Sequence, residues 1–155
     1  MSTVTLEAIK AEHERLGGLI AQLTSAPPIV ETIHFCMPAV DIELNPGEHY
    51  AGIVLNANGD VAHHLILLAG EAEEIKFDDA CTWAEKAGGA LPTRQEQALL
   101  YANLKAEFKP EWYWSGESLA DDASYAWTQG FLNGRQYDFR KSWQGRARAV
   151  RRFKA

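Results

Sequence analysis

The chain has 155 residues, of which 46% are hydrophobic and 23% are charged. This composition is typical of one globular domain with room for a small appendage, and it excludes an intrinsically disordered protein. The longest uninterrupted apolar run, Leu65–Ala69, is far shorter than the roughly 20 residues that span a bilayer. The first residues also lack the basic flank of a signal peptide. We therefore expect no membrane partner and a location in the cytoplasm of the producing cell.

The net charge of −6 is distributed unevenly along the chain. No acidic residue follows Asp138, whereas Arg140, Lys141, Arg146, Arg148, Arg151, Arg152 and Lys154 do. Such a basic end can bind nucleic acid. However, small and apolar residues interrupt the bases from Arg146 to Phe153, as in a strand that pairs into a sheet. We therefore favour charge complementarity within the protein or between subunits, and we disfavour nucleic acid as a partner.

The two cysteines, Cys36 and Cys81, are too few for a disulfide-stabilised secreted scaffold. Each lies in a segment that resembles a regular element. We expect both to be buried thiols in a reducing compartment.

The first predicted element is a helix from Thr5 to about Leu23. Its apolar seam has the 3-4-3-4-3 spacing of a heptad repeat and consists of Leu6, Ile9, His13, Leu16, Ile20 and Leu23. Gly17 and Gly18 weaken the helix by about 1 kcal/mol each relative to alanine. Because a narrow seam on a marginal helix needs a partner, we favour self-association through a short coiled coil, as a dimer or trimer. The alternative is an amphipathic helix that lies on its own domain.

Pro27 and Pro28 end this helix, so we expect an N-terminal segment at residues 1–26 and a domain at residues 27–155. Two alternating segments, 29–37 and 40–44, are predicted to be strands. Segments 50–55 and 61–68 flank Asn58–Gly59, which favours a β-hairpin. Residues 29–68 therefore form a predicted β-rich first half.

Two helices are predicted next. The first runs from Phe77 to Ala87, with Asp78 and Asp79 at its positive end and Gly88–Gly89 as its stop. The second follows the capping-box pattern 93–96 and continues to about Phe108. Short strands are then predicted at 112–114, 124–131, 136–139 and 146–153, with a hairpin turn at Asn133–Gly134.

The sequence motifs of the second half form a recognisable set. They are Gly89-Ala90-Leu91-Pro92-Thr93-Arg94-Gln95-Glu96, Trp112-Tyr113-Trp114-Ser115, Tyr125-Ala126-Trp127 and Arg146-Ala147-Arg148-Ala149-Val150-Arg151. Over residues 77–153 the chain resembles the DUF1566 (Lcl C-terminal) family, which has a C-type-lectin-like fold and is frequent in bacterial surface and phage or prophage proteins. The resemblance implies an α+β fold in which two helices and short antiparallel strands form a ligand-displaying scaffold. Association with a virion is an open alternative to a cytoplasmic location.

In this fold the aromatic residues of the motifs are usually core, so we interpret Trp112, Trp114 and Trp127 as packing residues. Loops on a rigid scaffold are the better place for a ligand surface. The candidate ligand-binding residues are Asp121, Asp122, Asn133, Arg135, Tyr137, Arg140, Trp143 and Gln144. Trp143 stands out because its surroundings are polar, although it is as well explained as a plug over the end of the core.

The sequence lacks the patterns of the common catalytic and metal sites. Asp121 and Asp122 are too few for calcium, which needs six to eight ligands. His63 and His64 point to opposite faces of a predicted strand and cannot chelate one metal together. The sequence contains no nucleophile elbow and no phosphate-binding glycine loop. It also has no cysteine after Cys81, so no pair of cysteines lies in its C-terminal half. We therefore expect no catalytic residue, no metal and no cofactor.

Three functional hypotheses follow. The preferred one is a non-catalytic binding module of phage or prophage type, which binds a protein or glycan ligand as a small homo-oligomer. The second is an intracellular regulator or inhibitor that binds a host protein or nucleic acid through the basic C-terminal strand. The third, an enzyme of unknown type, is disfavoured by the missing catalytic patterns.

Overall fold

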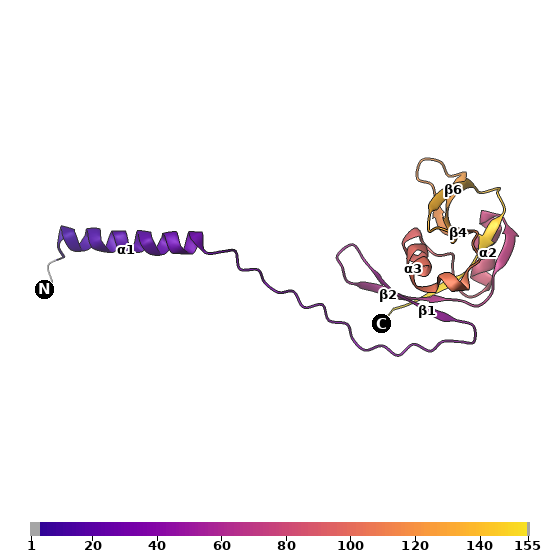
Figure 1. The fold of residues 1–155 in the computed structure, drawn as a ribbon, viewed down its shortest axis with the longest axis horizontal. Helices are drawn as coiled ribbons and strands as arrows, with labels where there is room; N and C mark the ends of the chain where they lie inside the picture. The colour runs from indigo at the N-terminus through magenta and orange to yellow at the C-terminus, as the bar shows by residue number, and fades with distance from the viewer. Residues whose placement is uncertain (1–3, 155) are drawn as a thin grey trace. The chain divides into compact units, whose positions relative to one another are not determined.

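The structure is a computed structural model that describes residues 4–154. The chain divides into a small N-terminal unit that ends at Cys36 and a larger unit that begins at Met37 (Figure 1). The two units are described separately below. No helix within residues 4–154 is long and apolar enough to cross a membrane.

The N-terminal unit contains one helix, α1 (Leu6–Ser25). Thr5 caps it, because its Oγ1 accepts a hydrogen bond from the Ala8 N–H at 3.3 Å. The predicted helix is therefore confirmed. None of its residues is buried, and the seam residues Leu6 and Leu23 are 67% and 79% exposed. Its pairing in a coiled coil stays a prediction.

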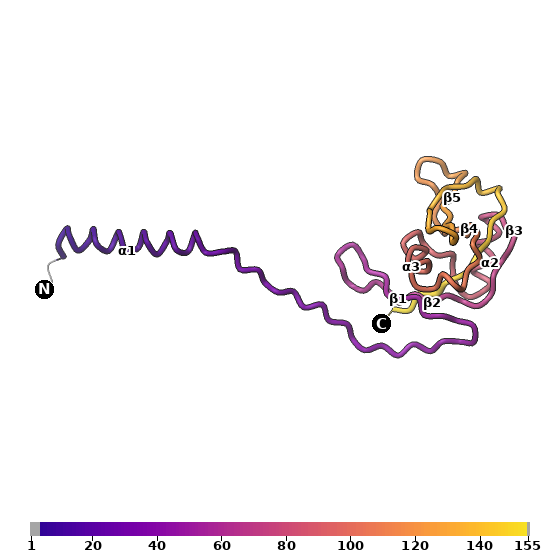
Figure 2. The backbone as a smooth tube through the Cα atoms, in the orientation of Figure 1, coloured from indigo at the N-terminus to yellow at the C-terminus, as the bar shows by residue number. Residues whose placement is uncertain are grey.

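The segment between α1 and the first strand differs from the prediction. Residues 27–45 contain neither helix nor strand, so the strands predicted at 29–37 and 40–44 are wrong (Figure 2). Their alternating pattern is real, but a strand forms only when its backbone groups pair with a neighbour, and among the described strands none pairs with this segment. Cys36 lies in it and is exposed, which corrects the expectation of a buried thiol.

The first sheet of the larger unit has three antiparallel strands in the order β1 (His49–Leu55), β2 (Val61–Leu67) and β8 (Val150–Phe153). The β1–β2 hairpin turns at Asn58–Gly59, as predicted. His63 and His64 contact different partners: His63 bonds to Glu96 of a helix, and His64 bonds to Tyr50. This confirms that the two imidazoles point to opposite faces.

The second sheet has five strands in the order β3 (Ala72–Ile75), β7 (Gly145–Ala147), β4 (Trp112–Ser118), β5 (Tyr125–Gly130) and β6 (Gln136–Arg140). All neighbours are antiparallel except β4 and β7. The predicted strand at 146–153 is in fact two strands, β7 and β8, which belong to different sheets. Strand β3 was not predicted.

Two helices lie between β3 and β4 of the five-stranded sheet, α2 (Phe77–Lys86) and α3 (Arg94–Leu104), and the 3-10 turn η1 (Lys105–Glu107) follows α3. The capping box predicted for α3 is present, because Thr93 and Glu96 exchange side-chain to backbone hydrogen bonds. The predicted α+β class is therefore confirmed.

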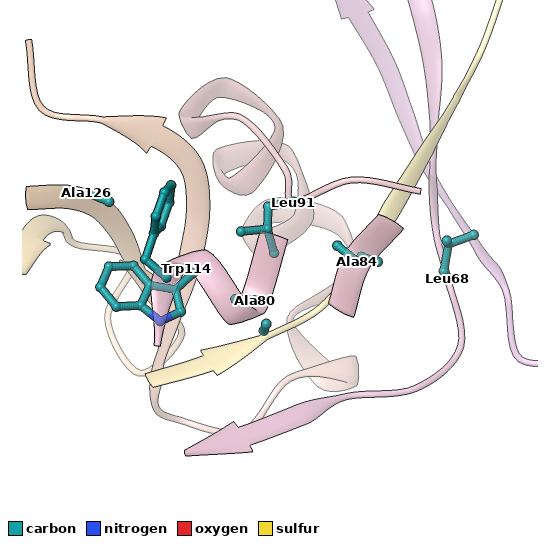
Figure 3. Close-up of a cluster of buried hydrophobic side chains, with 9 residues drawn as sticks. Leu68, Ala80, Ala84, Leu91, Trp114 and Ala126 are labelled. Carbon is teal, nitrogen blue, oxygen red and sulfur yellow. The ribbon is translucent and has the colours of Figure 1, made fainter. Parts of the chain in front are cut away.

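The interior contains two clusters of buried side chains. In the first, Trp114 of β4 lies with Ala80 and Ala84 of α2 and with Ala126 of β5 (Figure 3). In the second, Leu100 of α3 packs on β1, β2 and β4. Helix α2 therefore contributes to the first cluster and helix α3 to the second.

Candidate functional site

A pocket of about 390 Å³ opens beside β3, β4 and β7. Its walls come from three separate stretches of the chain and consist of Glu73, Glu74, Pro110, Glu111, Trp112, Trp143, Gln144, Gly145 and Arg146. We call it the Trp112–Trp143 pocket. Its volume lies at the lower end of the range for small-molecule sites.

The first wall is a β-bulge in the β3–β7 pair. Ala72 pairs with Ala147 and Ile75 with Gly145, so Glu73 and Glu74 together oppose the single residue Arg146. Glu74 has φ of 47°, and it is the one non-glycine residue with positive φ in residues 4–154. Bulges and left-handed residues of this kind re-aim side chains and concentrate at functional sites. Here the bulge brings both carboxylates to the pocket.

The two tryptophans stand in place because each ring lies against a glycine. A Cβ on Gly145 would come within 2.4 Å of the Trp143 ring, and a Cβ on Gly130 within 3.1 Å of the Trp112 ring. Phe139 joins the two: it stacks on Trp143 with centroids 4.4 Å apart and meets Trp112 edge-on at 5.4 Å. Packing against Phe139 and the two glycines therefore fixes the positions of the Trp112 and Trp143 rings.

The charges in the pocket are only partly compensated. Arg146 pairs with Glu73 at 2.6 Å and with Glu111 at 3.0 Å. Hydrogen bonds from Lys109 and then from Arg146 lower the pKa of Glu73 to about 2, so this carboxylate stays ionised. Glu74 makes no salt bridge with any residue in 4–154. With three carboxylates and one guanidinium, the walls are acidic overall.

The sequence-predicted site residues fall into three places. Trp143 and Gln144 line the pocket, and the exposed Tyr137 contacts the same Phe139 that supports Trp143. Trp143 also packs on Trp114 of the first core cluster, so it both covers the end of the core and lines the pocket.

The other five candidates lie outside the pocket. Asp121 and Asp122 belong to the β4–β5 loop, near the end of the β5–β6 hairpin that holds Arg140. Hydrogen bonds from Ser124 lower the pKa of Asp122, which therefore serves its own loop. Asn133 and Arg135 lie at the opposite, turn end of that hairpin. The eight residues thus do not form one site.

Sequence reasoning missed several walls of the pocket. Trp114 is core as predicted, with no exposed surface, but the partly exposed Trp112 is also a wall. The sequence patterns assign no site role to Glu73 or Glu74. One available signal was Gly145, two residues after Trp143, since glycine permits the close approach of a large ring.

The remaining interpretation of packing concerns Trp127, which is partly buried. The guanidinium of Arg94 lies 3.6 Å from the centre of the Trp127 ring and bonds to Gln136. This cation–π contact accounts for Trp127 without a ligand.

The basic C-terminal strand is largely neutralised within the chain. Arg146 pairs with Glu73 and Glu111, Arg151 with Glu48 at 2.8 Å, and Arg152 with Glu96 at 2.6 Å. Arg148 is buried and donates to the backbone oxygens of Glu107 and Leu68. The interpretation of internal charge complementarity is therefore confirmed for Arg146, Arg151 and Arg152, whereas Arg148 bonds to backbone oxygens only.

The described residues offer little other site chemistry. Among residues 4–154, no three His, Cys, Asp or Glu side chains gather closely enough to hold a metal ion. The thiol of Cys81 is partly buried, and burial followed by the charges of Asp78 and Glu85 raises its pKa. A raised pKa makes the reactive thiolate scarcer at neutral pH.

No protein-family model matches the chain, and a comparison with curated protein sequences finds no significant match. The geometry of the Trp112–Trp143 pocket is therefore the basis for the functional argument.

Proposed function

We propose that this chain is a non-catalytic binding module of phage or prophage type. In this proposal residues 77–153 form a C-type-lectin-like domain, and its Trp112–Trp143 pocket holds a neutral or amino-substituted saccharide. The observation that carries the proposal is the pocket itself, where two tryptophans and several hydrogen-bonding groups converge. The order of two helices followed by antiparallel strands is consistent with the proposed fold.

The walls suit a sugar because a sugar has both apolar and polar surfaces. Its C–H faces can lie against the rings of Trp112 and Trp143, which are large and rigid. Its hydroxyl groups can donate to the carboxylate of Glu74 and bond to the amide of Gln144, an exposed side chain. A few placed polar groups in an otherwise apolar cleft are the usual basis of orientation and specificity.

The charge of the walls selects among sugars. Because Glu73 and Glu111 are paired with Arg146, the unpaired carboxylate of Glu74 gives the pocket its excess negative charge. An anionic ligand would meet this carboxylate, and repulsion of this kind is a common source of specificity. Neutral sugars and cationic amino sugars are therefore favoured over sialic acids, phosphorylated sugars and nucleic acid.

The N-terminal helix supports display in several copies. Its apolar seam is exposed along its length and has the spacing of a coiled coil. When several weak binding sites are linked, their combined affinity for a surface that carries many copies of the ligand exceeds the affinity of one site. A small homo-oligomer of saccharide-binding domains follows, in the cytoplasm of the producing cell or on a virion.

The direct test is a titration of the full chain followed by intrinsic tryptophan fluorescence and calorimetry. The probes are glucose, galactose, N-acetylglucosamine and glucosamine, with N-acetylneuraminic acid as the anionic comparison. We expect at least one of the first four to bind with a Kd on the order of 1 mM or tighter, and the anionic sugar to bind more weakly.

Two variants locate the site. Gln144→Ala removes an exposed amide from the pocket, and we expect a several-fold weaker titration. Gln22→Ala removes an exposed amide from α1 and is the matched control, with unchanged binding. Equal affinities of the two variants, or no binding of any neutral or amino sugar, would contradict the proposal.

The alternative, a regulator or inhibitor that binds a host protein or nucleic acid through the basic C-terminal strand, receives less support. Three arginines of that strand region, Arg146, Arg151 and Arg152, are already paired with carboxylates of the same chain. Binding a phosphate backbone would require breaking these pairs.

A further inference from the structure

The segment just before the larger unit exposes an unusual amount of apolar surface. Ile29, Val30 and Ile33 are 91%, 87% and 92% exposed, and the ring of Phe35 is also exposed. The side chains of an extended backbone alternate between two faces. The odd-numbered residues Ile29, Ile33, Phe35 and Met37 would therefore lie on one face. The segment has the pattern of a half-buried strand but lacks a sheet.

The larger unit has the complementary feature, a sheet face that lacks full cover. One face of the β1–β2–β8 sheet packs on α3 through Ala51, Val54 and Leu65. On the other face Tyr50, Ile53, Ala62 and His64 line a groove of about 760 Å³. Its second wall is formed by residues 37–44 of the same chain. The outer edge of β1 is also unpaired among the described strands.

We propose that this groove receives residues 29–37 of a second copy of the chain. Residues 29–37 are an apolar, strand-like segment without a sheet, whereas the β1–β2–β8 sheet has an apolar face and an edge strand. Each copy has one such segment and one such sheet, so two copies can each bind the segment of the other. The self-complementary heptad seam of α1, which directly precedes the segment, specifies another copy of this chain as the partner.

Pro38 favours an extended conformation for Met37, as in the strand-like backbone proposed for residues 29–37. The proposed interface lies apart from the saccharide pocket, whose walls come from β3, β4 and β7. It rests on the homo-oligomer of the proposed function, and it adds a second interface.

The test uses the full chain with its segment thiol moved to the apolar face: Cys36, which is exposed but lies on the face opposite Phe35, is replaced by serine, and Phe35→Cys supplies the thiol. Ala62→Cys places a second thiol in the groove, and mild oxidation with diamide then joins thiols that meet. We expect a covalent dimer or larger species on non-reducing gels, in much higher yield than from the same chain without Ala62→Cys. Lys86→Cys, at the exposed end of α2, is the matched control and should give no increase.

A pair of substitutions on the segment checks that its apolar face is responsible. In the Ala62→Cys background, Ile33→Asp should abolish the cross-link, whereas the neighbouring Thr32→Asp, on the opposite face, should leave most of it. Both residues are exposed, so neither change threatens folding. Light scattering gives the mass of the uncross-linked protein, for which we expect a dimer or trimer.

Two results would overturn the proposal. One is a monomer at every concentration. The other is an oligomer in which Ala62→Cys cross-links no more than Lys86→Cys. A monomer would also contradict the homo-oligomer of the proposed function, but neither result affects the saccharide titration, which a monomer can satisfy, so failure of this interface and failure of the saccharide site are distinguishable.

Discussion

The buried carboxylate of Glu96 interacts with Arg152, Thr93 and His63, and Glu96→Gln should destabilise the protein strongly. Its side chain is only 1% exposed, and it accepts hydrogen bonds from Arg152 Nε at 2.6 Å and from Thr93 N–H at 2.8 Å. His63 Nε2 lies 2.7 Å from the same carboxylate. Burial alone would raise the pKa of Glu96, but the bonds from Arg152 and Thr93 outweigh it, so the pKa lies below its ordinary value.

The expected magnitude follows from what Glu96→Gln leaves behind. Breaking a buried ion pair costs about 3–5 kcal/mol when the partner charge stays buried. The Arg152 side chain is 33% exposed and can partly rehydrate, so we expect about 2–4 kcal/mol. In urea, with a slope of about 2 kcal/mol per molar, the unfolding midpoint should fall by about 1–2 M.

Two further variants separate the ion pair from the helix cap. Thr93→Ala removes the cap but keeps the charge, and should cost about 0.5–2 kcal/mol. Glu85→Gln, on the exposed side of α2, should stay within about 0.5 kcal/mol of the wild type. A Glu96→Gln protein as stable as the Glu85→Gln control would refute the reasoning.

Three other outcomes are expected. Arg151 lowers the pKa of Glu48 from 4.5 to about 2, so the stability from this pair is present above pH 4.5 and is lost as the pH falls toward 2. Glu48→Gln should therefore lower the free energy of unfolding at pH 7 by on the order of 2 kcal/mol. Between pH 4.5 and 2, the stability of this variant should depend less on pH than that of the wild type. Gly145→Ala places a Cβ against the Trp143 ring and should shift tryptophan emission and weaken saccharide binding, with unchanged emission as the contrary result. Leu100→Ala, in the second core cluster, should cost about 2–5 kcal/mol in urea unfolding, and a cost below 1 kcal/mol would contradict that packing.

The elements that sequence predicted well are those with local signals. Thr93 and Glu96 define the start of α3 through a capping box, and Asn58–Gly59 defines the β1–β2 turn. Such signals depend on residues within a few positions of one another, so no knowledge of the tertiary structure is needed.

The elements that sequence predicted poorly depend on distant partners. Residues 29–37 have a strand pattern but pair with no strand within residues 4–154. The segment 146–153 changes sheets at Arg148, whose guanidinium bonds to the backbone of Glu107 and Leu68. These contacts span 41 and 80 positions along the chain, and a pattern of alternating residues does not encode them.

The candidate site shows the same division. Trp143 and Gln144 could be predicted because a large aromatic residue stood in a polar stretch. The part played by Glu74 could not, since it depends on a β-bulge that exists only when β3 pairs with β7. Trp112 is interpreted as core because aromatic residues of its motif are usually core in the fold that the chain resembles, and that reason does not separate the partly exposed Trp112 from the fully buried Trp114.

The most direct test of the central claim is heteronuclear NMR of the tryptophan indole N–H groups during titration with the neutral and amino sugars. Trp112 and Trp143 line the proposed pocket, whereas Trp83 and Trp127 do not. The account predicts saturable shifts of the Trp112 and Trp143 resonances, with those of Trp83 and Trp127 unchanged. Shifts confined to Trp83 or Trp127, or no shift with any of these sugars, would contradict it.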